Sequence, residues 1–593
     1  MSSPLEPTRP LSREEVAKLE IGHTEIAGWL ARTMTAVFVL AVFVVPLLHE
    51  LSGPAEQGES RTVACWPRCC SIFTTLPEVA LAFDRAEGDL WQRTLAANAR
   101  LLKNIDLYEG SLKEESDLVG RLLGPTQYCL AKWGRLGNEK AYLGSEGWLF
   151  YRPSVDYVTG PGFLDPRMLA KRSQSGKPYA MPPRPDPRAA IIAFAEQLRR
   201  RGISLILVPA PGKATLQPER LSPRYARDQA VLQNESFERW KQDVEREGVL
   251  VFDPAPLLRE RKLRTGEDPF LKTDTHWSAA AMQQVAEALG AFIEARAPLP
   301  PPPSVDYRAR RRTTENLGDI AAMLRLPVDA ALYPPETVEI RQIVDGDGAL
   351  WQPDRSADVL LLGDSFTNIY SQEAMRWGEA AGLAEQLSFA LRRPLDRISQ
   401  NDAGAYATRQ TLSQDLARGD DRLAGKRLVI WEFAARELAV GDWKMFPLVA
   451  GKARGEGDKV LPLPPRAAQG GGGKLPSSPA NERTLVVRAK VETSAGVPRP
   501  GSVPYRDAVT SLHLSAVEAI DGTAPSDQIV VYVLGMRNNR WTAAASYKAG
   551  DVVTLKLRPW ATVSSKYGSL TRIELDDPDF TLIDLPLFWG EEQ

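Results

Sequence analysis

The sequence predicts an α/β protein built on a parallel sheet, with an N-terminal transmembrane helix and a small C-terminal all-β domain. Three observations support this fold class. Short apolar runs alternate with helical segments in the middle of the chain, one apolar stretch lies near its start, and alternating strand patterns fill its end. Strand–helix alternation is typical of parallel sheets. With 593 residues, the chain is long enough for several such units.

The apolar stretch near the start predicts a membrane anchor over residues 27–49. Residues 34–48 are uncharged, and extending the run back to residue 27 adds only one charge, Arg32. About 20 such residues cross a bilayer. A buried core helix and a cleaved signal peptide are the alternatives, although no clear cleavage site follows.

Basic residues indicate the orientation of this anchor. More of them precede the uncharged run at 34–48 than follow it closely: Arg9, Arg13, Lys18 and Arg32 against Arg61 and Arg68. This weak bias places residues 1–26 in the cytoplasm and the bulk of the chain in the periplasm, as a single-pass protein of the inner membrane. An oxidising compartment permits two disulfides, with open connectivity, among Cys65, Cys69, Cys70 and Cys129.

The exported part divides into four segments. Residues 50–137 carry helical periodicity and form a helical or stalk region, and residues 138–463 form the α/β domain. A Pro/Gly/Ser-rich linker follows at 464–481, and a β domain fills 482–593. Within the α/β domain, buried strands are expected at 203–208, 249–252, 359–362 and 428–433. Helices are expected at 189–201 and 278–295, the second with Ser278 as N-cap.

The last segment reads as a small sandwich-like or OB-like domain. RTLVVRAKVE, QIVVYVLG and VVTLKLRPW are short alternating strands between turns. Aromatic side chains of this segment could stack on sugars, which favours a carbohydrate-binding role, or could fill its core: Tyr505, Tyr532, Trp541, Tyr547, Trp560 and Tyr567.

Composition excludes several functional classes. The net charge of −2 gives no general attraction to nucleic acid. The chain has only four histidines, namely His23, His49, His276 and His513. A multi-histidine metal site is therefore not expected, and no cofactor is predicted.

Two short motifs in the α/β domain suit nucleophilic chemistry. Asp274 and His276 are separated by one residue in a polar loop before a helix, and a carboxylate beside an imidazole fixes its tautomer. Ser365 lies in a Gly-Asp-Ser turn directly after the apolar run at 359–362, where the sites of open α/β sheets gather. Each motif alone is common, but His276 is the one histidine of this domain. Together they predict a Ser–His–Asp site.

These motifs bear a family resemblance. GDSF at 363–366 resembles the nucleophile block of SGNH-type hydrolases, and DTHWS at 274–278 resembles the acid/base block of the AlgJ/AlgX alginate O-acetyltransferase family. YLGSEGWLF at 142–150 is similar to the first motif of that family, and WEF at 431–433 followed by Arg436 resembles its late strand motif. The four motifs span residues 138–440 in the family's order.

The resemblance implies an SGNH-like α/β sandwich in the periplasm that acetylates an exopolysaccharide. It makes Ser365 the nucleophile, His276 the general base and Asp274 its orienting partner. It also implies a multi-pass membrane O-acyltransferase as acetyl supplier. In ordinary SGNH enzymes the acid/base block comes last, so the oxyanion and substrate groups here stay open: the Ser365 N–H, Tyr370, Asn401, Gly404 and Arg436.

Two other functions remain open. With water as the acceptor, the same three residues would make a polysaccharide acetyl-esterase, and exclusion of water depends on pocket shape. A non-catalytic polysaccharide-binding component of a secretion complex is the third candidate.

Overall fold

The computed structural model describes residues 27–52, 72–449 and 485–592. Short gaps interrupt these ranges at 74, 115–116, 177–180, 302–304, 328, 402–403, 501–502, 504, 521–523, 569, 576, 578–580 and 583–584. The predicted cytoplasmic tail (1–26) and linker (464–481) lie outside the described residues. The chain forms two compact units, Met1–Gly124 and Pro125–Gln593, which are described separately.

The first unit is helical. It contains α2 (Gly28–Ser52), α3 (Leu76–Arg85) and α4 (Leu90–Glu114), and α5 (Asp117–Lys132) runs into the second unit. Helical periodicity therefore predicted the structure of this region correctly. The predicted anchor coincides with α2, but among the described residues no helix is both long and apolar enough to cross a membrane. The transmembrane part of the prediction thus has no support in the structure.

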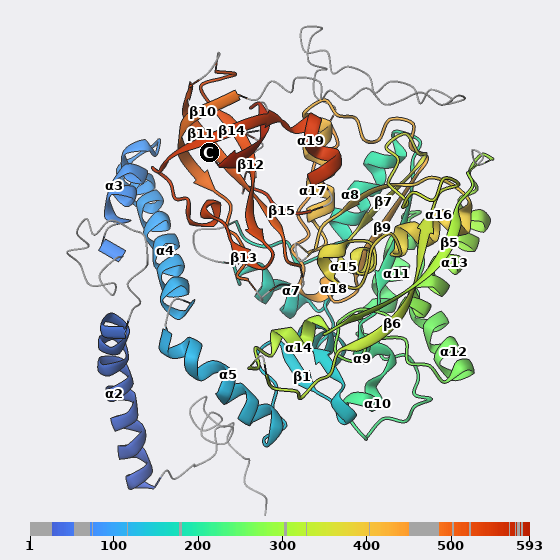
Figure 1. The fold of residues 1–593 in the computed structure, drawn as a ribbon, viewed down its shortest axis with the longest axis horizontal. Coiled ribbons are helices and arrows are strands. Elements are labelled where there is room, and N and C mark those ends of the chain that lie inside the picture. Colours follow the sequence, from blue (N-terminus) through green and yellow to red (C-terminus); the bar gives the residue numbers. More distant parts are fainter. Residues whose placement is uncertain are drawn as a thin grey trace, which may run out of the picture. The chain divides into compact units, whose positions relative to one another are not determined.

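The second unit is built around a five-stranded sheet (Figure 1). Its strand order is β4 (Leu250–Val251), β3 (Ser204–Ala210), β9 (Leu428–Ala434), β7 (Val359–Gly363) and β8 (Asp396–Ser399). All neighbouring pairs are parallel. The parallel sheet and four of its strands are thus confirmed. The fifth strand, β8, was not predicted because its sequence, DRIS, is mostly polar.

Helices cover both faces of this sheet, which explains its continuous apolar runs. On β3, Ile206 and Val208 pack into one core cluster with α12 (Ala255–Thr265), α13 (Ala279–Arg296) and α16 (Leu383–Leu391). Leu205 and Leu207 point to the other cluster, with α8 (Pro187–Arg199), α11 (Phe237–Arg246) and α17 (Ala407–Ala417). The carboxyl ends of the strands are left open to loops, where ligands bind in such sheets.

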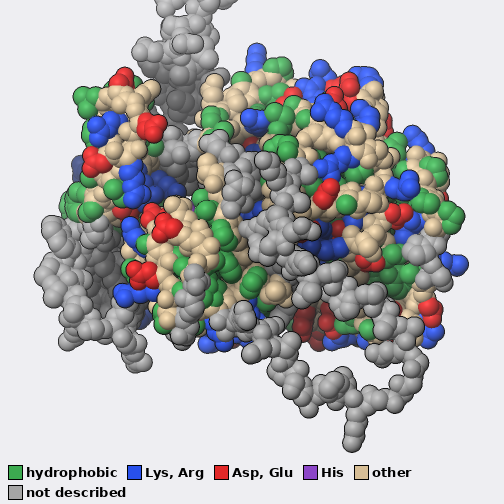
Figure 2. All heavy atoms as spheres, turned by 90° about the horizontal axis from the view of Figure 1, so that it is seen from above, with side chains coloured by type: hydrophobic (Ala, Val, Ile, Leu, Met, Phe, Trp, Pro, Cys, Tyr) green, Lys and Arg blue, Asp and Glu red, His purple; other side chains and the backbone are tan. Residues whose placement is uncertain are grey.

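Two antiparallel ribbons accompany the sheet. β1 (Ala141–Leu143) pairs with β2 (Leu149–Tyr151), and β5 (Arg308–Asn316) pairs with β6 (Glu336–Val344). The second ribbon was not predicted because β5, RARRRTTEN, lacks alternating apolar residues. On the face drawn in Figure 2, basic and acidic side chains are interspersed, in line with the net charge of −2.

The C-terminal strands form a closed barrel. Pairings run from β12 (Ile529–Arg537) through β16 (Leu587–Glu592), β14 (Val552–Pro559) and β10 (Leu485–Ser494) to β11 (Ala508–Ala519), which pairs back with β12. This confirms the all-β prediction.

The aromatic side chains of the barrel serve mainly its core. Tyr505 and Tyr532 are buried, and Trp560 and Tyr567 pack against the buried Trp589. Trp541 is exposed. Carbohydrate binding by this domain therefore stays a prediction.

Of the four cysteines that could form two disulfides, the structure describes one. Cys129 carries a free thiol on α5. Cys65, Cys69 and Cys70 lie outside the described residues, so disulfide formation stays a prediction.

Candidate active site

A glutamate holds the loop that carries DTHWS. Glu336, at the start of β6, accepts the N–H of Lys272 at 2.8 Å and both the N–H and the hydroxyl of Thr273 at 2.7 Å. At the far end, Ser278 caps α13 as predicted and accepts the N–H of Ala281 at 3.3 Å. The loop is therefore fixed on both sides of its Asp–x–His motif.

Within this loop, Asp274 and His276 form a buried pair. His276 Nδ1 lies 2.6 Å from Asp274 Oδ1, and the other carboxylate oxygen accepts the indole N–H of Trp377 at 2.9 Å. The imidazole is only 1% exposed. Its Nε2 has no hydrogen-bond partner among the described residues. Nε2 is the atom that a general base uses when a carboxylate holds Nδ1.

The electrostatics of the pair favour charge separation. Burial by itself would raise the pKa of Asp274, but the charge and hydrogen bond of His276 and the Trp377 N–H lower it to about 2. The ionised carboxylate can only accept, so Nδ1 carries the proton. Burial also opposes charge on His276, yet the carboxylates of Asp274, Asp319 and Asp364 raise its pKa above the ordinary value. The site thus stabilises an imidazolium.

Ser365 begins α15 (Ser365–Asn368) directly after β7, at the carboxyl edge of the sheet. Asp364 shapes this turn: its Oδ1 accepts the N–H of Phe366 at 2.8 Å, and its Oδ2 accepts the N–H of Ala434 at 2.8 Å. The Phe366 ring packs edge-on against the imidazole of His276, with centroids 4.8 Å apart. The fold therefore brings the serine turn and the histidine loop together, although no hydrogen bond joins the two side chains in the described structure. Catalytic hydrogen bonds are often long before substrate binds.

Tyr370 makes its contacts inside the protein. Its side chain is completely buried, and its hydroxyl donates to the carbonyl oxygen of Trp277 at 2.8 Å. The hydroxyl already has an internal acceptor in this structure, so the expected role of Tyr370 as a donor to the oxyanion gains no support and stays a prediction. The bond instead ties the helix after Ser365 to the DTHWS loop.

The side-chain amide of Asn401, which follows β8, also has hydrogen-bond partners within the protein. Its carbonyl oxygen accepts from Asn368 at 2.8 Å, and its amide donates to Gln372 and to Thr571 of the barrel, both at 3.1 Å. An amide with these partners is not free to bind an oxyanion. The residue therefore joins the catalytic domain to the C-terminal barrel.

Two further candidates lie near each other. Gly404 has a φ of +65°, and a Cβ there would lie 3.1 Å from Glu437 Oε2. Arg436 lies over the Tyr151 ring at 5.1 Å, and its Nε is 3.8 Å from Glu437 Oε1. Arg436 therefore links the loop after β9 to the end of β2 through Tyr151, and its role toward substrate stays a prediction.

Three buried charged residues of the site were missed from the sequence: Lys213, Asp319 and Glu432. Lys213 Nζ donates to the carbonyl oxygens of Leu149 at 2.7 Å and Lys272 at 3.1 Å, so it ties the GWLF segment to the histidine loop. A lysine five residues after the buried strand ISLILV was the available signal, but nothing in the sequence indicates which loop it reaches.

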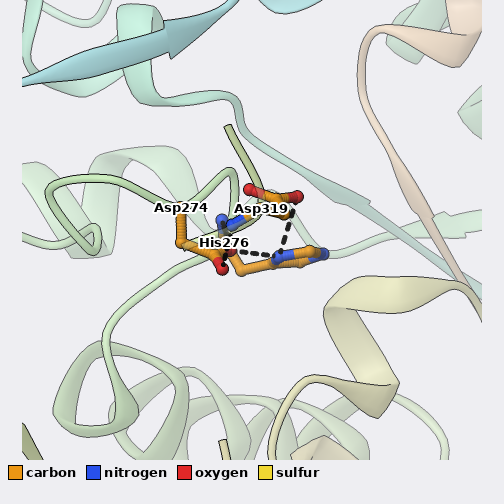
Figure 3. A group of neighbouring side chains, drawn as sticks. All are labelled: Asp274, His276 and Asp319. Atoms are coloured by element: carbon orange, nitrogen blue, oxygen red, sulfur yellow. Dashed lines mark hydrogen bonds and ion pairs between the residues drawn. The ribbon is translucent and has the colours of Figure 1, made fainter. Parts of the chain in front are cut away.

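Asp319 completes a cluster of three groups (Figure 3). The ligand atoms of Asp274, His276 and Asp319 lie within 4.8 Å of one another, a spacing that would suit a cation. However, His276 Nδ1 donates its proton to Asp274 and has no lone pair to offer a metal there. The cluster is therefore a hydrogen-bonded acid–base group.

The parallel sheet, the serine at its carboxyl edge and the buried Asp–His pair define an SGNH-hydrolase-like protein. Residues 141–435 match the family described as SGNH hydrolase-like domain, acetyltransferase AlgX. Residues 141–435 are therefore identified as an AlgJ/AlgX-like domain.

Curated relatives are similar over this part of the chain. The probable alginate O-acetylase AlgJ of Pseudomonas fluorescens is 26% identical over 260 residues, which cover 43% of this chain and 62% of that protein. That of Azotobacter vinelandii is 27% identical over 292 residues, covering 46% and 70%. The AlgJ of Pseudomonas aeruginosa is 27% identical over 321 residues, covering 52% and 73%. The chain thus spans under two thirds of the Pseudomonas fluorescens relative.

Solved structures resemble the chain less closely. The O-acetyltransferase domain of Pseudomonas putida AlgJ is 20% identical, with a TM-score of 0.38, covering 50% of this chain and 92% of that one. Pseudomonas aeruginosa AlgX is 12% identical, with a TM-score of 0.35, covering 72% and 93%.

Proposed function

We propose that this protein is an O-acetyltransferase that moves acetyl groups onto hydroxyls of an exopolysaccharide through an acyl-serine at Ser365. The observation that carries this proposal is the buried Asp274–His276 pair with Nε2 unpartnered, packed against the turn that bears the serine. The match of residues 141–435 to the AlgX acetyltransferase family supports the reaction class. The names of the AlgJ relatives support a polysaccharide substrate related to alginate.

The proposed reaction has two half-steps. First, His276 Nε2 takes the proton of Ser365 Oγ, the oxygen bonds to the acetyl carbon, and the bond from that carbon to the donor's leaving oxygen breaks. The proton then passes from His276 to the leaving group. In the second half, a sugar hydroxyl gives its proton to His276 and attacks the acetyl carbon. The bond to Ser365 breaks, and the proton returns to Oγ.

Asp274 supports both half-steps. Each time His276 takes up a proton, the ionised carboxylate faces the new imidazolium at 2.6 Å. Since the pair is buried, this attraction is poorly screened by water. The Ser365 N–H, at the start of α15, is the proposed donor to the oxyanion.

The location of the protein is a further part of the proposal. We propose that the acetyltransferase domain works in the periplasm, tethered to the inner membrane by residues 27–49, and receives acetyl groups from a multi-pass membrane O-acyltransferase. Fractionation of cells tests the tether: recovery of the full chain in the membrane pellet, and of a chain lacking residues 1–52 in the soluble fraction, supports it. Recovery of both in the soluble fraction contradicts it.

The decisive experiment uses the full chain with 4-methylumbelliferyl acetate, with and without an oligosaccharide acceptor. The expected results are acetylated sugar and, after rapid quenching, an acetyl group on the peptide containing Ser365. Ser365→Ala should abolish both, whereas the matched variant Ser356→Ala, at an exposed loop serine, should keep them. Release of acetate to water alone would favour the esterase. Full activity of Ser365→Ala would exclude both enzymes and leave a binding role.

A further inference from the structure

A second carboxylate faces the nitrogen of His276 that Asp274 already holds (Figure 3). Asp319 Oδ2 lies 3.9 Å from His276 Nδ1, and Asp274 Oδ1 lies 2.6 Å from the same atom. Asp319 begins α14 (Asp319–Met323) and is buried. We infer that Asp319 is a positioning residue that sets the proton affinity of His276 and holds the loop bearing it.

The start of α14 is bonded directly to this loop. Asp319 Oδ1 accepts the N–H of Thr275 at 2.7 Å, and the N–H of Asp319 donates to Asp274 Oδ2 at 3.0 Å. The N–H of Gly318 donates to Thr273 Oγ1 at 3.1 Å. A Cβ at Gly318 would lie only 2.3 Å from the Thr273 carbonyl carbon, so this close approach requires glycine. Every residue from Thr273 to Thr275 is thus fixed by α14.

Charged groups face this cluster from several elements. Asp364 approaches from the β7–α15 turn, Lys213 from α9 (Lys213–Leu216), and Glu336 from β6. Burial and the nearby charge of Asp274 raise the pKa of Asp319 to about 7. Asp319 therefore titrates near neutral pH, and because its Oδ2 lies 3.9 Å from His276 Nδ1, the ionisations of these two groups are coupled.

The catalytic consequence rests on the proposed role of His276 as general base. An ionised Asp319 attracts the imidazolium, so it raises the pKa of His276. Asp319→Asn removes this charge but keeps an oxygen that can accept the Thr275 N–H. The variant should therefore preserve the loop and lower the pKa of His276. Asp319→Glu restores the charge.

The direct test is an NMR titration of the full-length chain labelled at histidine. Four histidines give few signals, and His276→Gln identifies the one that matters. We expect the titration midpoint of His276 to fall by about half a pH unit or more in Asp319→Asn. It should return toward the wild-type value in Asp319→Glu and stay unchanged in Asp329→Asn, an exposed control on the same segment. An unchanged midpoint in Asp319→Asn would overturn the inference.

The pH dependence of kcat/KM for the aryl acetate gives a second readout. Its acid limb should move to lower pH in Asp319→Asn by the same amount as the NMR midpoint. A lower kcat/KM with an unchanged midpoint of the acid limb would show that Asp319 has only a structural role, which would contradict the inference. The NMR titration does not depend on turnover, so it tests Asp319 even if full activity of Ser365→Ala had overturned the proposed function.

Discussion

The backbone N–H of Asp364 donates to Glu432 Oε2 at 3.0 Å, which joins the end of β7, beside Ser365, to the neighbouring strand β9. The same oxygen accepts the hydroxyl of Thr367 at 2.8 Å. Burial and the charge of Asp364 raise the pKa of Glu432 well above its ordinary value of 4.5. The raised pKa favours the neutral form of Glu432, which holds the serine turn as a hydrogen-bonding group.

Glu432→Gln should consequently be mild, because an amide keeps the acceptor oxygen and adds no charge. Glu432→Ala should lower the free energy of unfolding by about 1–3 kcal/mol, since Asp364 N–H and the Thr367 hydroxyl lose a buried acceptor. Urea denaturation of both variants measures the difference.

The pH dependence has a defined sign. A carboxyl group whose pKa is raised on folding binds protons more tightly in the native state, so its contribution falls as the pH rises above the ordinary value of 4.5. Glu432→Gln should therefore gain stability relative to wild type as the pH rises above that value. Equal losses in the Gln and Ala variants at all pH values would contradict this role of Glu432.

Lys213 should matter for activity through the two loops it joins. Lys213→Met removes both hydrogen bonds to backbone carbonyls, while the Lys272 carbonyl oxygen keeps the N–H of Leu149 at 3.0 Å. We expect about 1–3 kcal/mol lower stability and a reduced kcat with the aryl acetate, because a buried hydrogen-bond donor is lost and the histidine loop keeps only its backbone bond to the GWLF segment. Lys171→Met, at an exposed lysine, is the control. Wild-type kcat in Lys213→Met would contradict this role.

The indole N–H of Trp377 should help to keep Asp274 ionised, because it donates a hydrogen bond to the carboxylate. Trp377→Phe removes the N–H that the carboxylate accepts at 2.9 Å and keeps most of the buried ring. A hydrogen bond to a charged group contributes about 1.5–3 kcal/mol, so kcat/KM should fall by about 10-fold or more. Trp443→Phe, on the opposite face of the sheet, is the matched control. Equal activities of the two variants would rule out the proposed effect.

Asp274 also predicts an acid-dependent loss of stability. Its pKa is lowered on folding from 3.8 to about 2, so its stabilising effect is present above pH 3.8 and is lost as the pH falls toward 2. Asp274→Asn should be less stable than wild type at pH 7, and the difference should shrink below pH 4. Thermal unfolding across this range measures it, and a constant difference would contradict the assignment.

The C-terminal barrel should stabilise the catalytic domain. Thr571 accepts from Asn401, and the N–H of Arg572 donates to Gln400 at 3.0 Å. Thr571→Val keeps the shape but removes the acceptor, so it should cost about 0.5–1.5 kcal/mol, and Thr571→Ser should cost less. A single unfolding transition that shifts in Thr571→Val would fit this coupling. Two independent transitions, with only the barrel's shifted, would exclude it.

Much of the fold could be predicted because its signals are local. ISLILV and LVIWEF are largely apolar on both faces, which is the pattern of strands in a sheet that is covered on both sides. Ser278 caps its helix through a residue only three positions away. The strand β8 and the ribbon β5–β6 were missed because their polar residues are satisfied by partners distant in sequence. Asp396, for example, is buried on β8 beside Arg422.

By itself, the sequence determined the parallel sheet, the serine after its strand and the pairing of Asp274 with the domain's one histidine, because adjacent residues and repeating patterns encode them. Only the tertiary structure decided which other groups complete the site. It brought Asp319 to His276 and engaged Asn401 and Tyr370 elsewhere. Such contacts join residues tens of positions apart, and no local pattern records which loops will meet at the edge of a sheet.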